Sequence, residues 1–116
     1  MMIVYYELLP QAYLLVPAHD PTTSELPLAW QLKRAMHSGK PAVWVDCRLL
    51  HTLSATTIRL LRACHRSLQR RQAQLVLCHV PAGVAGRPEL AGLCQVPTYE
   101  HAAALPGPGL RTSAEA

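Results

Sequence analysis

Side chains that could do chemistry gather between residues 46 and 57. Asp46 ends an apolar run, His51 lies in the polar stretch after it, and hydroxyl groups follow at Ser54, Thr56 and Thr57. A catalytic Asp46 needs a second acid, base or nucleophile beside it, and only His51 and Ser54 are near in sequence. We therefore predict that the chain is not an enzyme. We interpret these residues as a partner-binding site whose three hydroxyl groups are candidates for phosphorylation.

Ser54 and Asp46 each have two interpretations. Serine is a favoured helix cap, which stabilises a helix by about 1 kcal/mol, and Ser54 directly precedes a helical pattern. Alternatively Ser54 is a regulatory residue, because a phosphate there would lie beside free backbone N–H groups and near Arg59. Asp46 either accepts hydrogen bonds from the following loop or presents its carboxylate to a partner.

An arginine stripe follows the hydroxyl groups. Arg59, Arg62, Arg66 and Arg70 recur at helical spacing, and Arg71 adds a fifth cation. Such a stripe can neutralise phosphates, so a small basic nucleic-acid-binding protein is one alternative. No aromatic residue is interleaved with the arginines, which favours a solvated helix face that binds an acidic protein partner.

Metal, cofactor and nucleotide sites lack support in the sequence. None of the six histidines pairs with another ligand at a zinc-site spacing, and the chain contains neither a Walker motif nor a dinucleotide fingerprint. The four cysteines form no C-x-x-C pair, which indicates buried free thiols in a reducing compartment. The first residues do not resemble a signal peptide, and no run of 18 apolar residues occurs. We expect no metal, no cofactor, no membrane insertion and a cytoplasmic location.

The elements that position these residues form an α/β pattern. We expect a domain over residues 1–105 and a loose tail over 106–116. A first helix contains Leu28, Leu32, Ala35 and Met36, is capped by Thr22, Thr23 or Ser24, has Glu25 in its first turn and ends at Gly39. Trp30 and Trp44 are expected to be core or boundary anchors. The other expected elements are strands at Ile3–Leu9, Ala12–Val16, Ala42–Val45, Gln74–Val80 and Gln95–Tyr99, and helices at about Ala55–Arg71, 88–93 and 100–104.

This order of elements resembles the STAS domain of bacterial anti-sigma factor antagonists, over roughly Ile3 to Ala104. The similar pieces are Val45-Asp46 closing the third strand, the Ser54 helix entry, LVLCHV as the fourth strand, and the short helical stretch from Pro88 to Leu93 before a final strand. The resemblance implies a single STAS-like domain with a mixed, mainly parallel sheet of about five strands and helices packed against it. It also implies a role in signal transduction.

In antagonists that are switched by phosphorylation, an Asp-Ser pair starts the second helix and the Ser accepts the phosphoryl group. Here Ser54 and Ala55 fall on those two positions, so the usual acceptor is replaced by Ala55. A switch in this chain would then use Ser54, Thr56 or Thr57.

We predict a non-catalytic regulator that docks a protein partner through the 48–54 loop and the helix after it. The resemblance implies that the partner is an anti-sigma factor kinase or another regulator. An alternative within the same fold is a cytoplasmic accessory subunit of a lipid-transport ABC system. The predicted contact residues are Asp46, His51, Ser54, Thr56, Thr57, Arg59, Arg62 and Arg66.

Overall fold

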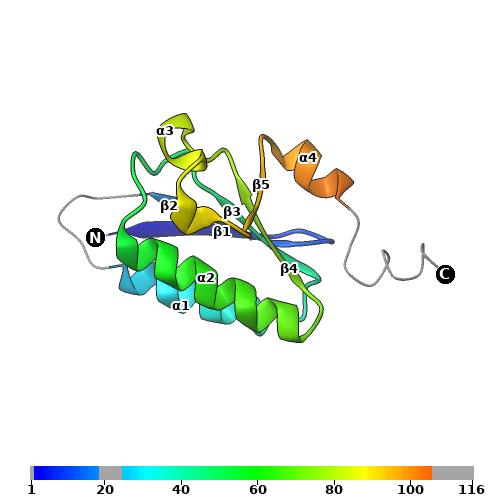
Figure 1. Cartoon of the computed structure of the whole chain (residues 1–116). Helices are drawn as coiled ribbons and strands as arrows, with labels where there is room; N and C mark the ends of the chain where they lie inside the picture. Colours follow the sequence, from blue (N-terminus) through cyan, green and yellow to red (C-terminus); the bar gives the residue numbers. More distant parts are fainter. Residues whose placement is uncertain (1, 19–24, 106–116) are drawn as a thin grey trace.

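A computed structural model describes residues 2–18 and 25–105, and Figure 1 shows the path of the chain. The strands are β1 (Ile3–Leu8), β2 (Tyr13–Ala18), β3 (Ala42–Asp46), β4 (Gln74–Cys78) and β5 (Cys94–Val96). The helices are α1 (Leu26–Met36), α2 (Ala55–Arg70), the short α3 (Ala82–Ala85) and α4 (Tyr99–Ala104), with a 3₁₀ turn, η1, at Pro88–Leu90.

The five strands lie side by side in chain order. Strands β1 and β2 form an antiparallel hairpin, whereas β2–β3, β3–β4 and β4–β5 are parallel. Each parallel pair needs a crossover connection, and α2 supplies the one between β3 and β4. The predicted α/β class with a mixed, mainly parallel sheet is confirmed.

Helices cover both faces of the sheet. Helices α1 and α2 lie side by side on one face, as Figure 1 shows, and form the larger core with it. Helix α4 covers part of the other face, where Tyr99 and Ala102 pack near Trp44 and Val76. The larger core fixes the position of α2, because four residues of this helix are buried in it: Ile58, Leu61, Cys64 and Leu68. A buried aliphatic side chain contributes about 1.5–3 kcal/mol.

Several predicted boundaries and positions are wrong. Strand β2 starts at Tyr13 instead of Ala12 and continues to Ala18. Strand β4 stops at Cys78, because His79 has a left-handed φ of 54° that extended backbone does not allow. A short helix, α3, occupies a stretch between two expected elements, for which no helix or strand was expected. Trp44 is buried as expected, but Trp30 is 63% exposed and does not anchor the core.

The start of α1 also differs from the expectation. Glu25 is the residue before the helix instead of a member of its first turn, and it makes no side-chain capping bond to α1. The alternative caps at Thr22, Thr23 and Ser24, and the predicted tail at 106–116, lie outside the described residues.

Candidate partner-binding site

The junction between β3 and α2 is built by a serine cap. Ser54 has an extended conformation, with φ of −70° and ψ of 160°, and α2 begins at the next residue. The backbone N–H of Thr57 donates to Ser54 Oγ at 3.0 Å. This bond satisfies one of the free N–H groups of the first helical turn, so the predicted capping role of Ser54 is confirmed.

A carboxylate from another element lies at the same helix end. The Ser54 hydroxyl donates to Glu25 Oε1 at 2.9 Å, across 29 positions of the chain. Helix α2 has no acidic residue in its own first turn. Glu25 therefore supplies the negative charge that stabilises a helix at its N-terminus. The same carboxylate would repel a phosphate attached to Ser54.

The three candidate hydroxyl groups differ in access to solvent. Thr57 is only 3% exposed and lies 3.1 Å from Ser54 Oγ. Ser54 is half-buried, whereas Thr56 is exposed. The guanidinium of Arg59 donates to Thr56 Oγ1 at a long 3.4 Å. Thr56 is thus the one of the three whose hydroxyl group lies at the surface beside a cation.

Asp46 is buried at the carboxyl end of β3 and is only 1% exposed. The backbone N–H of Arg48 donates to its Oδ1 at 3.0 Å, and Arg48 Nε donates to its Oδ2 at 2.8 Å. The hydroxyl of Tyr99 also donates to Oδ2. Asp46 therefore accepts hydrogen bonds from the loop that follows it, and the partly exposed side chains of Arg48 and Tyr99 lie between it and the surface.

These hydrogen bonds raise the pKa of the two side chains that donate to Asp46. The hydrogen bond to Asp46 raises the pKa of the Arg48 guanidinium above its ordinary value. Burial, followed by the hydrogen bond to Asp46, raises the pKa of Tyr99 to about 12. Arg48 remains a cation and Tyr99 remains a neutral donor at physiological pH. Both Asp46 oxygens accept hydrogen bonds, so this cluster holds the loop in place instead of offering a free base.

His79 joins this cluster from the end of β4. Arg48 Nη2 lies 3.0 Å from His79 Nε2, and because a guanidinium can only donate, the imidazole nitrogen accepts. The rings of His79 and Tyr99 meet edge to face, with centroids 5.5 Å apart. His51 stands apart from this arrangement, exposed in the loop that leads to Ser54.

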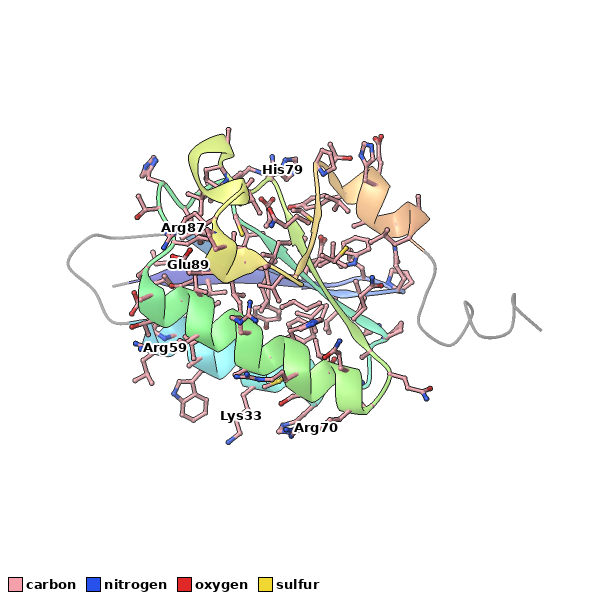
Figure 2. The ribbon with its side chains drawn as sticks, in the orientation of Figure 1. Lys33, Arg59, Arg70, His79, Arg87 and Glu89 are labelled. Carbon is pink, nitrogen blue, oxygen red and sulfur yellow. The ribbon has the colours of Figure 1, made fainter. Side chains whose placement is uncertain are left out.

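Two arginines tie the start of α2 to the segment around η1. Arg62 Nη1 donates to the backbone oxygens of Glu89 at 2.8 Å and Ala91 at 2.9 Å. Arg87 Nη1 donates to the Leu53 oxygen at 3.1 Å, and its Nη2 donates to the Glu89 carboxylate. Figure 2 shows Arg87 and Glu89 above the end of α2 that carries Arg59, with Arg70 at the opposite end.

An open groove separates the first turns of α2 from η1. Its volume is about 330 Å³. The largely buried Ile58 side chain gives the groove an apolar part, and the arginines make its walls cationic. The lining residues are Ala55, Ile58, Arg59, Arg62, Arg87, Pro88 and Glu89.

The predicted arginine stripe is therefore divided in two. Arg62 is half-buried and bound to backbone oxygens, while Arg59, Arg66 and Arg70 are exposed along α2. Sequence spacing placed these four together but did not separate the structural arginine from the exposed ones. The roles of Glu25, Arg87 and Tyr99 at this site were also missed, because their partners lie 29 to 53 positions away in the chain.

Within residues 2–18 and 25–105, no three His, Cys, Asp or Glu side chains lie close enough together to hold a metal ion. Over the same residues, no helix has the length and apolar character required to cross a membrane. Burial raises the pKa of the Cys47, Cys64 and Cys78 thiols to about 12. Thiols with such a pKa are poor nucleophiles at neutral pH.

Comparison with solved structures identifies the fold. An anti-sigma factor antagonist from Mycobacterium paratuberculosis superposes with a TM-score of 0.72 at 16% identity, covering 96% of this chain and 95% of that one. An anti-sigma factor antagonist (STAS) domain protein from Planctomyces limnophilus gives a TM-score of 0.69 at 15% identity, covering 85% and 92%. The fold is that of a STAS domain.

A variant of RsbS from Moorella thermoacetica is also similar, with a TM-score of 0.68 at 15% identity over 97% of this chain and 98% of that one. No family model and no curated protein matches the sequence. The STAS resemblance noted in the sequence is thus confirmed at the level of the fold.

Proposed function

We propose that this STAS domain is a non-catalytic regulator of the anti-sigma factor antagonist type. It docks a protein partner through residues 48–54, the first turns of α2 and the groove beside η1. The observation that carries the proposal is the helix surface itself. Helix α2 contains four arginines and no acidic residue, and three of the arginines are exposed along it.

The groove supports an acidic partner that also carries an apolar side chain. Arg59 can pair with a carboxylate of the partner, and Ile58 and the exposed Pro88 line the apolar part of the groove. Complementary charge speeds encounter and selects the partner, while burial of the apolar contact adds affinity. An anti-sigma factor kinase or a related regulator with an acidic docking face fits this description.

A rigid surface supports binding over catalysis. Asp46 holds the loop through Arg48 and Tyr99, while Arg62 and Arg87 hold the η1 segment against α2. Such fixed contacts lower the ordering cost of binding. They also occupy the groups that a catalytic mechanism would need free. We place this activity in the cytoplasm, where the four free cysteines remain reduced.

If the chain is switched by phosphorylation, we propose Thr56 as the acceptor. Its hydroxyl group lies at the surface beside Arg59, whereas Thr57 is buried and Ser54 is bonded to Glu25. A phosphate on Thr56 would pair with Arg59 and add close to two negative charges to the docking face. That change would weaken the attraction for an acidic partner.

Nucleic-acid binding is the competing function, because the exposed arginines of α2 could also contact phosphates. Arg62 interrupts this row by turning to the backbone of η1, which argues against a continuous phosphate track. Binding to an arbitrary duplex that falls steeply with added salt would favour this competitor over the proposed function.

Capture from the native cell with a charge-reversed variant tests the proposal. The variant Arg59→Glu with Arg66→Glu changes exposed α2 positions and leaves the Arg62 contacts in place. The control Lys33→Glu with Lys40→Glu changes the net charge equally but lies outside α2. We expect the wild type and the control to capture the same protein and the α2 variant to lose it. Equal capture by all three would contradict docking through α2.

A further inference from the structure

Strand β1 leaves one edge of the sheet open and apolar. Four of its six residues are large, apolar and more than half exposed: Ile3 at 53%, Tyr5 at 56%, Tyr6 at 51% and Leu8 at 60%. Its only charged residue is Glu7. Natural proteins protect such edges with lysine, proline, bulges or very short strands, and β1 has none of these. The opposite edge strand, β5, has only three residues and is followed by Pro97.

The outward backbone groups of β1 can be assigned from the hairpin. The Leu9 N–H donates to the Ala12 oxygen, so this pair is a bonded pair of the antiparallel ladder. Bonded and non-bonded pairs alternate, so Val4, Tyr6 and Leu8 direct their backbone N–H and C=O groups away from β2. Val4 lies opposite Pro17, which has no N–H to offer, in agreement with this assignment. In the part of the chain that the structure describes, no other strand lies beyond this edge.

We propose that a second copy of this chain pairs with β1, edge to edge and antiparallel, about a two-fold axis at Tyr6. In this register Tyr6 of each copy lies opposite Tyr6 of the other, and Val4 lies opposite Leu8. All three outward pairs of backbone groups are then bonded, and the two Glu7 carboxylates face Tyr5 instead of each other. Like charges directly opposite are thereby avoided.

The exposed area at β1 suits a reversible dimer. With roughly 200 Å² for each large residue, the exposed parts of the four apolar residues sum to about 450 Å² per copy. Because these side chains alternate between the two faces of the sheet, strand pairing covers only part of each, and the area buried by both copies stays below about 1,000 Å², in the range of weak, reversible interfaces. A dimer of this size should dissociate on dilution.

This interface is independent of the proposed docking surface. Strand β1 lies at the edge of the sheet near α1, whereas α2 packs against α1 and β4. Both copies of the dimer would therefore keep α2 and its groove free, and loss of dimerisation alone would not abolish partner capture.

Sedimentation analysis over a range of concentrations tests the pairing. We expect the apparent mass of the wild type to double as concentration rises and the variant Tyr5→Lys with Leu8→Lys to remain a monomer. Trp30→Lys is the matched control, because Trp30 is a large exposed apolar residue that belongs to α1 and not to the pairing strand. A wild type that stays monomeric, or a dimer lost only in Trp30→Lys, would overturn the proposal.

Cysteine cross-linking tests the register. Bonded antiparallel pairs have Cα atoms about 5.5 Å apart, a separation that a disulfide spans. Under mild oxidation, Tyr6→Cys should form an inter-copy disulfide and Glu7→Cys should not. The reverse pattern would refute the register. A monomer whose Tyr6 and Leu8 amides exchange slowly with solvent would show that the chain covers its own edge, and would overturn the dimer.

Discussion

The division of the arginines predicts that Arg62 stabilises the fold and that Arg66, one turn further along α2, does not. Replacing Arg62 by Met keeps much of the aliphatic length and removes both hydrogen bonds to the Glu89 and Ala91 oxygens. A hydrogen bond from a charged donor contributes about 1.5–3 kcal/mol. Because Arg62 is only half-buried, water compensates part of that loss. We expect Arg62→Met to lower the free energy of unfolding by about 1–3 kcal/mol.

The assay is urea unfolding followed by circular dichroism, with Arg66→Met as the control. Arg66 has the same side chain on the same helix and is exposed, so its replacement should change stability by less than about 0.5 kcal/mol. The slope of free energy against urea should be equal in all three proteins, since the area exposed on unfolding is unchanged. Equal effects at the two positions would refute the structural role of Arg62. A charge reversal at Arg62 would therefore change both the stability of the domain and its docking surface, so it could not test docking alone.

Three further predictions concern groups around the β3–β4 end of the sheet and the buried thiols. Asp46→Asn should lower stability by about 1–3 kcal/mol, because it removes the buried carboxylate that accepts hydrogen bonds from Arg48 and Tyr99. The exposed Glu100→Gln should have little effect, and equal urea midpoints would contradict the role given to Asp46. The folded chain holds the Tyr99 proton up to about pH 12, while the unfolded chain releases it near the ordinary tyrosine pKa of 10.0, so stability should decline as the pH rises between those values. Tyrosinate absorbance is titrated in the wild type and in Tyr99→Phe, and the difference between the two curves gives the titration of Tyr99. Its midpoint should lie near pH 12, and a midpoint near pH 10.0 would count against the buried hydroxyl. Burial raises the pKa of three thiols to about 12, those of Cys47, Cys64 and Cys78. These thiols should therefore react with a disulfide reagent at neutral pH only after unfolding. Rapid labelling of the three in the native chain would contradict their burial.

Elements with a strong local signal could be read from the sequence. The α2 stripe is one example, since Ile58, Leu61, Cys64 and Leu68 recur at helical spacing and are all buried. The apolar runs of β3 and β4, separated by that helix, indicated the parallel pair. Ser54 was recognised as a cap because its partner, the N–H of Thr57, is only three positions away.

Features that depend on distant contacts could not be read in the same way. The Glu25 carboxylate beside the start of α2 and the carbonyl partners of Arg62 lie 27 to 29 positions from the residues they bind. The left-handed conformation of His79, which shortens β4, is set by the surrounding structure. The position holds neither glycine nor asparagine, the residues that would indicate such a conformation in a sequence. Trp30 was misplaced because its residue type favours burial, whereas its position on α1 directs it to solvent.

Photo-crosslinking in the native cell is the most direct test of the docking surface. A photoreactive residue replaces Thr56, which is exposed at the start of α2, and in a separate experiment replaces Glu100, which is exposed on α4. We expect the probe at 56 to form a covalent adduct with one protein and the probe at 100 to leave that protein unlinked. An adduct that forms only from position 100, or an adduct at 56 that contains nucleic acid, would contradict the proposed function.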